Sequence, residues 1–180
     1  MGNMSPFTNQ FMECEPEEFE RRQDVYALSV SNVSDKTIEK LTLVYTNGKK
    51  ELTFLVEMLP AGWTIVAMDT NGTTVSETKL TYVSGKVEYL TVGRELTDEV
   101  ELTETLNSTI IVKNMSGEEM KQVIVYYRDV DYQGNVLAGR CFSASTTMEL
   151  IPGWQEELET DQWLNSCVIV NVILLDEIPE

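Results

Sequence analysis

The chain has 180 residues, of which 42% are apolar and 8% aromatic, and a formal net charge of −17. This composition supports a hydrophobic core, and the charge opposes binding to nucleic acids and to anionic membranes. The chain has no histidine, which excludes Ser-His-Asp and Cys-His catalysis and His-ligated metal sites. Catalysis would have to come from carboxylates, Tyr, Lys or Cys; paired carboxylates of the glycosidase kind are the main route still open, and the sequence selects no pair.

Residues 1–20 are rich in glutamate around Pro16, and we expect them to form an acidic, flexible leader. An alternative is that Phe7, Phe11 and Met12 of the leader pack against the domain that follows. The N-terminus lacks the basic and apolar regions of a signal peptide. No stretch reaches the ~20 apolar residues of a membrane span, so direct membrane insertion is not predicted.

Alternating apolar and polar residues predict six or seven short strands in the first half of the chain, with frequent turn signals between them. Asn47-Gly48 and Asn71-Gly72 predict tight hairpins, because both central residues of a type I′ turn need positive φ. Ser84-Gly85-Lys86 is expected to close a further hairpin, between strands at 73–83 and 87–92.

An internal repeat runs through the chain at an offset of 82 residues, aligning 28–45 (LSVSNVSDKTIEKLTLVY) with 110–127 (IIVKNMSGEEMKQVIVYY). Such a repeat is too long for a solenoid unit and suits a small all-β domain. The sequence therefore predicts an all-β fold of two tandem immunoglobulin-like antiparallel β-sandwich domains. After the leader, their expected bounds are 21–94 and 95–180.

The second repeat carries a longer central hairpin. Tyr45 and Trp63 lie 18 positions apart, whereas their equivalents Tyr127 and Trp154 lie 27 apart. Further on, 168–175 (VIVNVILL) is apolar on both faces, which predicts a central or covered strand because an exposed edge of this kind would aggregate.

Residues 129–135 (DVDYQGN) resemble the start of an EF-hand loop, with oxygen donors at positions 1, 3 and 5 and glycine at position 6. Position 12 of that loop needs a glutamate and is Arg140 here. We therefore interpret the segment as an acidic hairpin tip and keep Asp129 and Asp131 as candidate ligands of a weak calcium site. No other metal and no cofactor is predicted.

Trp63 and Trp154 follow Pro/Gly turns at equivalent places in the repeats, and we expect both to pack in the core. Trp163 has no counterpart in the first repeat and is the candidate for contact with a ligand. Stacking of a sugar ring on such an indole is the alternative function that this residue would serve.

The three cysteines, Cys14, Cys141 and Cys167, allow three single bridges. Cys141–Cys167 is the candidate disulfide if the protein is exported, and all three thiols would stay reduced in the cytosol. No cationic cluster is evident that would lower the pKa of a thiol, so a catalytic cysteine is not predicted.

Four Asn-x-Ser/Thr sequons occur, at Asn32, Asn71, Asn107 and Asn114. Asn32 and Asn114 occupy equivalent strand-to-turn corners, where Asn and Ser side chains cap turns. We prefer this structural role to glycosylation for these two residues.

The second repeat opens with a V-x-N-x-S pattern, continues with an alternating strand and an Asp/Gly hairpin, and ends at an L-x-PG turn. In these features it resembles the FxLYD-type bacterial domain and related cell-adhesion modules, which are small immunoglobulin-like sandwiches. The chain departs from them in its longer hairpin and in the tryptophan that follows each Pro-Gly turn. The residues that carry the resemblance are Ile110, Val112, Asn114, Ser116, Val123, Val125, Tyr127, Asp131, Gly134, Leu150, Pro152 and Gly153.

This resemblance implies a domain of exported or cell-envelope proteins of Gram-positive bacteria, without a catalytic site. We predict a non-catalytic binding or scaffolding module, not an enzyme, with a protein or glycan partner at the cell surface and no nucleic-acid partner. A cytoplasmic location is the alternative. A carbohydrate- or calcium-dependent ligand-binding module is the second functional hypothesis, and a carboxylate glycosidase is the third.

Overall fold

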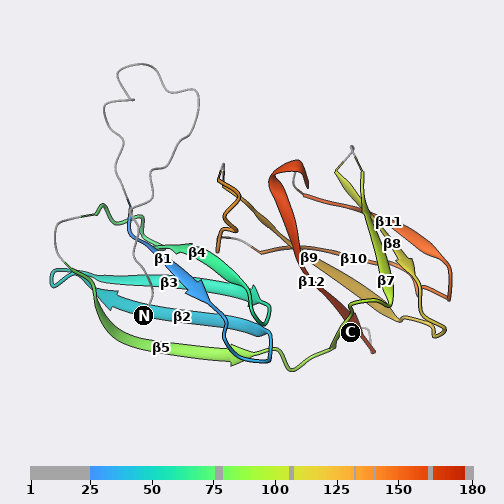
Figure 1. Cartoon of the computed structure of the whole chain (residues 1–180), viewed down its shortest axis with the longest axis horizontal. Coiled ribbons are helices and arrows are strands. Elements are labelled where there is room, and N and C mark those ends of the chain that lie inside the picture. The colour runs from blue at the N-terminus through green and yellow to red at the C-terminus, as the bar shows by residue number, and fades with distance from the viewer. Residues whose placement is uncertain are drawn as a thin grey trace, which may run out of the picture. The chain divides into compact units, whose positions relative to one another are not determined.

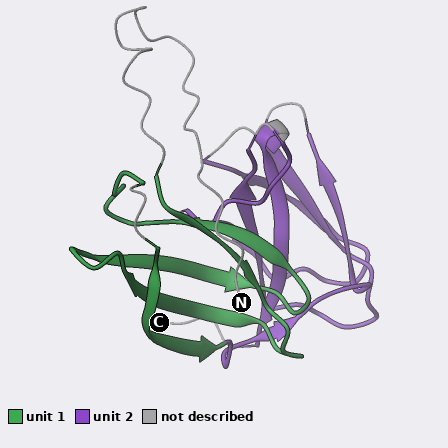
Figure 2. Cartoon of the chain, turned by 60° about the vertical axis from the view of Figure 1, so that its left-hand side comes forward, with its two compact units in different colours: residues 1–89 green, residues 90–180 purple. Residues whose placement is uncertain are grey.

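The computed structural model describes residues 25–75, 79–105, 108–131, 133–139, 141–161 and 164–176. Within these ranges the chain forms antiparallel β-sheets and contains no α-helix, which confirms the predicted all-β class. The expected leader, Trp163, Cys14 and Asn107 lie outside the described residues. The chain divides into two compact units, Met1–Tyr89 and Leu90–Glu180 (Figure 2).

The first unit has two antiparallel sheets, in the orders β1-β4 and β3-β2-β5. Strand β3 alternates strictly, so that Leu52, Phe54 and Val56 are fully buried between the sheets. Figure 1 shows β5 at the outer edge of its sheet. The strands are β1 (Ala27–Ser31), β2 (Ile38–Thr46), β3 (Glu51–Leu59), β4 (Thr64–Met68) and β5 (Thr81–Tyr89).

The predicted hairpin at Gly85 is wrong, because β5 runs without a turn from Thr81 to Tyr89 and Gly85 pairs with Leu43 of β2. A Cβ atom at Gly85 would lie 2.9 Å from the Tyr82 hydroxyl and 3.2 Å from a Leu43 methyl carbon. The glycine therefore provides space beside two side chains, in the middle of a strand.

The Asn47-Gly48 hairpin forms, but with a loop of four residues between β2 and β3 in place of a two-residue type I′ turn. Gly48 has a φ of +82°, while the Asn47 carboxamide oxygen accepts the backbone N–H groups of Lys49 at 3.0 Å and Lys50 at 2.9 Å. The asparagine side chain thus closes the loop from its own position.

The second unit also has two sheets, in the orders β11-β8-β7 and β10-β9-β12-β6. Their facing side chains form one hydrophobic cluster, to which β8, β9, β10, β11 and β12 all contribute, so the unit is sandwich-like. The strands are β6 (Arg94–Glu95), β7 (Val100–Glu104), β8 (Thr109–Asn114), β9 (Gln122–Asp129), β10 (Phe142–Ser145), β11 (Gln155–Glu159) and β12 (Cys167–Leu175), with a short 3-10 turn at Leu164–Ser166.

Strand β12 confirms the prediction of a covered strand. It lies between β9 and β6, and its last six residues are all buried. Gly93, before β6, has a φ of +80°, and a Cβ atom there would lie 2.5 Å from an Ile173 methyl carbon. The chain therefore approaches β12 more closely than any side chain at position 93 would allow.

The sheet orders β1-β4 and β3-β2-β5 of the first unit match β8-β11 and β10-β9-β12 of the second, so β1 to β5 correspond to β8 to β12. Strands β6 and β7 precede the second repeat. No described residue of the first unit supplies their equivalents, so its two sheets have fewer strands than those of the second unit.

Candidate functional site

The polar residues that recur between the repeats build corners of the fold. Asn114 is fully buried, and its amide nitrogen donates to the carbonyl oxygens of Glu118 at 2.8 Å and Leu150 at 2.7 Å. Its carboxamide oxygen accepts from the backbone N–H of Ser116 at 2.9 Å and from the Ser116 hydroxyl at 2.8 Å. Asn32 makes the same four bonds at 2.7–3.1 Å. The preferred turn role of these asparagines is therefore confirmed.

The tryptophans after the Pro/Gly turns do not share the expected core position. Trp154 exposes 60% of its surface and Trp63 is half-buried, so core packing is wrong for Trp154. The backbone of Trp154 still closes the corner, because its N–H donates to Ile151 at 3.0 Å and its carbonyl oxygen accepts from Asn114 at 2.9 Å. The indole ring is thus left available for contact with a ligand.

The acidic hairpin uses one of its carboxylates to hold its own backbone. One oxygen of Asp131 accepts the N–H groups of Gln133 and Asn135, both at 2.8 Å, and the other accepts the Asn135 amide at 2.8 Å. Desolvation opposes ionisation, but hydrogen bonds led by that from Asn135 outweigh it and lower the pKa of Asp131. Asp129 instead accepts from the Cys167 thiol at 3.4 Å. The two candidate calcium ligands therefore have different partners.

No disulfide joins Cys141 and Cys167, so the candidate bridge is not formed. Cys167 pairs with Asp129 on one side of β9, whereas Phe142, next to Cys141, pairs with Tyr127 on the other side. Strands that flank a third strand lie about 9.5 Å apart, beyond the ~7 Å between Cα atoms that a disulfide allows. Desolvation, with the Asp129 carboxylate, raises the pKa of Cys167 to about 11 and opposes nucleophilic chemistry.

The sequence analysis did not identify Arg128, a charged residue in the core of the second unit. It is fully buried, and its Nη1 donates to the carbonyl oxygens of Leu137 at 3.3 Å and Gly139 at 2.9 Å. Both carbonyls belong to the inserted hairpin of the second repeat. Because a buried cation must find acceptors, this pairing anchors the insertion on β9.

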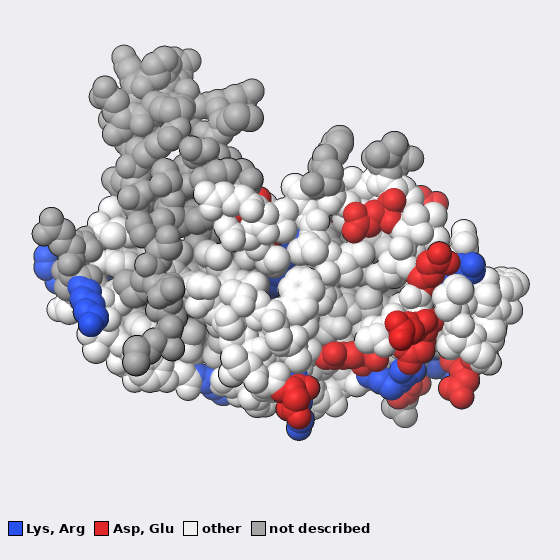
Figure 3. All heavy atoms as spheres, in the orientation of Figure 1, with Lys and Arg blue, Asp and Glu red and all other residues white. Residues whose placement is uncertain are grey.

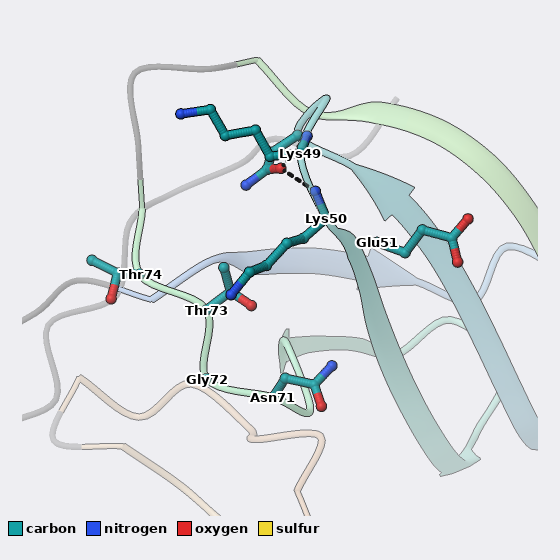
Figure 4. Close-up of a pocket in the computed structure, with 8 residues that line it drawn as sticks. Lys49, Lys50, Glu51, Asn71, Gly72, Thr73 and Thr74 are labelled. Carbon is teal, nitrogen blue, oxygen red and sulfur yellow. Dashed lines mark hydrogen bonds between the residues drawn. The ribbon is translucent and has the colours of Figure 1, made fainter.

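A pocket of about 500 Å³ lies between the β2–β3 hairpin loop and the loop at 71–74 of the first unit (Figure 4). The predicted hairpin at Asn71-Gly72 is wrong, because β4 and β5, on either side of it, belong to different sheets. The Lys50 side chain extends toward Thr73, while Lys49 points away from it. Glu51 is the one carboxylate among the described lining residues, so the pocket lacks the carboxylate pair of a glycosidase. Its lining is Asn47, Lys49, Lys50, Glu51, Asn71, Gly72, Thr73 and Thr74.

The negative charge is concentrated in the second half of the chain. Residues 90–180 hold 17 acidic and five basic side chains, a net charge of −12, whereas residues 25–89 hold seven and six, a net charge of −1. In Figure 3, acidic side chains gather over the region of β7, β8 and β11. Residues 25–89 would therefore repel an acidic molecule less than the whole-chain charge suggests.

The β5 strand is the candidate binding surface among the residues that the structure describes. All nine of its residues are exposed, and β2 is its one described neighbour in the sheet. Four of its large side chains expose 42–56% of their surface, far more than a sandwich strand of this composition normally does. They are Tyr82, Val83, Val87 and Tyr89.

No described strand pairs with the outer edge of β5. In the second unit the corresponding edge of β12 is occupied by β6, which pairs Arg94 with Leu174 and Glu95 with Ile173. The sequence analysis missed this surface because it placed a turn at Gly85. An edge of this kind offers unpaired N–H and C=O groups to another strand.

Comparisons with protein-family models, with curated proteins and with solved structures found no match to the chain. In the part of the chain that the structure describes, no helix is both long and apolar enough to cross a membrane.

Proposed function

We propose that the protein is a non-catalytic binding or scaffolding module, and that it binds a protein partner by adding a strand of that partner to the outer edge of β5. The observation that carries the proposal is the outer edge of β5 (Thr81–Tyr89), which has no strand neighbour among the described residues. Strand addition obtains affinity from backbone hydrogen bonds and specificity from alternate side chains.

The occupied edge of β12 supports this mode of binding. There the two-residue strand β6 pairs with the strand that corresponds to β5. In the second unit, therefore, the edge that corresponds to the outer edge of β5 is paired with a short strand of the chain itself.

We further propose that the two units are tandem immunoglobulin-like domains of an exported or cell-envelope protein. The repeat at an offset of 82, the paired antiparallel sheets of each unit and the resemblance to FxLYD-type domains support this arrangement. A fold of this kind hosts many functions, so the binding role rests on the β5 edge rather than on the architecture.

Photo-crosslinking tests the binding role in the cells that produce the protein. A benzophenone amino acid at Val83, which is 45% exposed on β5, should form an adduct of defined mass with a second protein. The Val83→Lys variant should weaken binding of that protein at least tenfold, because a charge at an edge opposes pairing. Val33→Lys is the matched control, since Val33 is 95% exposed outside the strands. No adduct from Val83, or equal loss in both variants, would refute the proposal.

A glycan-binding module is the second candidate function, and the observation that favours it is the exposed indole ring of Trp154. An aromatic face at the surface can stack on a sugar ring. A titration with cell-wall oligosaccharides, followed by tryptophan emission, should saturate for the native protein and lose its response in Trp154→Ala. An identical response in both proteins would remove this candidate.

A further inference from the structure

One edge of β1 has no strand neighbour among the described residues, whereas the equivalent edge of β8 in the second unit pairs with β7. The N–H groups of Tyr26 and Asn32 donate toward the β4 side, to Thr73 at 3.3 Å and Trp63 at 2.9 Å. Because alternate residues of an antiparallel strand point to opposite edges, the N–H groups of Ala27, Ser29 and Ser31 point the other way. No described strand pairs with that side of β1. In the second unit, the same side of β8 pairs with β7 over five residues.

The inner face of β5 is also more exposed than the inner face of β12, its counterpart in the second unit. Val87 pairs with Leu41 of β2, and Leu174 of β12 pairs with Val123, which is the repeat equivalent of Leu41. Val87 nevertheless exposes 44% of its surface and Leu174 only 6%. Two apolar side chains at equivalent places in the sandwich therefore differ in what lies over them.

Strand β7 accounts for this difference. Its Val100 and Leu102 pack against the hydrophobic cluster that contains Leu174. β7 is joined to β8 by the four residues 105–108, so the cover comes from the chain immediately before the first strand of the repeat. In the first unit, the chain that precedes β1 and its first described residues is 1–24.

We propose that a segment of residues 1–24 adds antiparallel to the free edge of β1 and covers the inner face of β5. Five residues of strand and a four-residue connection need nine residues, and 24 are present. Apolar side chains that can face Tyr82, Val87 and Tyr89 are available in this segment, at Phe7, Phe11, Met12 and Phe19.

The charges also favour the first unit as the place where this segment docks. Residues 1–24 hold six acidic and two basic side chains, a net charge of −4. Residues 25–89 carry a net charge of −1, against −12 for residues 90–180. An acidic segment is therefore repelled less at β1 than at the second unit.

Residue-resolved amide exchange of the full chain tests the proposal. The amides of Ala27, Ser29 and Ser31 should exchange at least tenfold more slowly than unprotected amides, because the added strand would accept from them. Those of Leu28 and Val30, which bond to β4, report whether the unit is folded. Unprotected exchange at the first three amides, with Leu28 and Val30 protected, would overturn the proposal. So would protection that rises with protein concentration, which would identify a second copy as the occupant.

Two triple variants distinguish the contribution of apolar side chains to this docking from the contribution of charge. Replacing the apolar side chains should speed exchange at the three amides at least tenfold, while replacing neighbouring carboxylates should change it less than twofold. Equal effects of the two triple variants would contradict the proposal. The first is F11S/M12S/F19S, and the matched control is E13Q/E15Q/E18Q.

A benzophenone amino acid at Tyr89 gives a second readout that does not depend on the variants. Tyr89 pairs with Ile38 and is 42% exposed on the inner face, so its crosslink should fall within residues 1–24 of the same chain. An adduct only with another protein or a second copy would overturn the proposal. Crosslinking from Val83 reports on the outer edge of β5, so failure of the binding role and failure of this docking are distinguishable.

Discussion

Substitution of Asn114 by alanine tests the corner that both repeats share. The side chain is fully buried and makes four hydrogen bonds, two donated to the carbonyls of Glu118 and Leu150 and two accepted from Ser116. Alanine removes all four bonds and supplies no replacement. The Leu150 carbonyl is buried and keeps one donor in the variant, the N–H of Met120 at 3.0 Å, so the loss is that of the bonds themselves.

The expected loss follows from these four bonds. A typical hydrogen bond contributes about 0.5–1.5 kcal/mol net, and Asn114→Ala removes four of them. We therefore expect Asn114→Ala to lower the free energy of unfolding by about 3 kcal/mol. Asn32→Ala should cost a similar amount, because its network is the same. Since the two corners lie in different units, the double variant should be additive within about 0.5 kcal/mol.

Urea unfolding, followed by tryptophan emission and far-ultraviolet circular dichroism, measures these losses. Asn71→Ala is the control, because Asn71 is exposed at a turn and should cost less than about 0.5 kcal/mol. Ser116→Ala, which removes only the hydroxyl, should cost about 1 kcal/mol. A loss below about 1 kcal/mol for Asn114→Ala, or a loss equal to that of Asn71→Ala, would refute the structural role of the buried amide.

The raised pKa of Cys167, about 11, predicts slow alkylation by iodoacetamide at pH 8, and Asp129→Asn should speed it about 3–10-fold by removing a charge that disfavours the thiolate. Peptide mapping by mass spectrometry measures the rate at this site, and an unchanged or slower rate in the variant would contradict the cause given. Gly93→Ala should lower the free energy of unfolding by about 3 kcal/mol, because it combines a left-handed conformation with a close contact at 2.5 Å. Gly153→Ala shares the positive φ but has no atom within 4 Å, so the same urea assay should give about 1 kcal/mol; equal losses would exclude the contact as the cause.

Local chemistry made part of the fold predictable. Asn32 and Asn114 cap turns mainly through hydrogen bonds to residues two to four positions further along the chain, and each adds one bond to a more distant carbonyl. Their role could therefore be inferred from the repeat. The apolar run of β12 likewise identified a covered strand, because such a run is unstable at an exposed edge.

The features that were missed depend on neighbours distant in sequence. Gly85 resembled a turn, but its space is used by Tyr82 and by Leu43 of another strand. Trp154 repeats the position of Trp63, yet the local turn fixes its backbone and leaves the direction of the ring to tertiary packing. The candidate binding surface on β5 was missed for the same reason, since the alternation of a strand does not show whether another strand pairs with its edge.

The buried guanidinium of Arg128 ties loop length to the identity of a single residue. Its repeat equivalent is Thr46, whose hydroxyl donates to the Lys50 carbonyl at 3.0 Å and so closes the short loop of the first unit. A long loop needs a long donor at this position and a short loop needs a short one. Loop grafting between the two units should therefore exchange this residue together with the loop, because a shortened loop alone would leave a cation in the fold without its carbonyl oxygens.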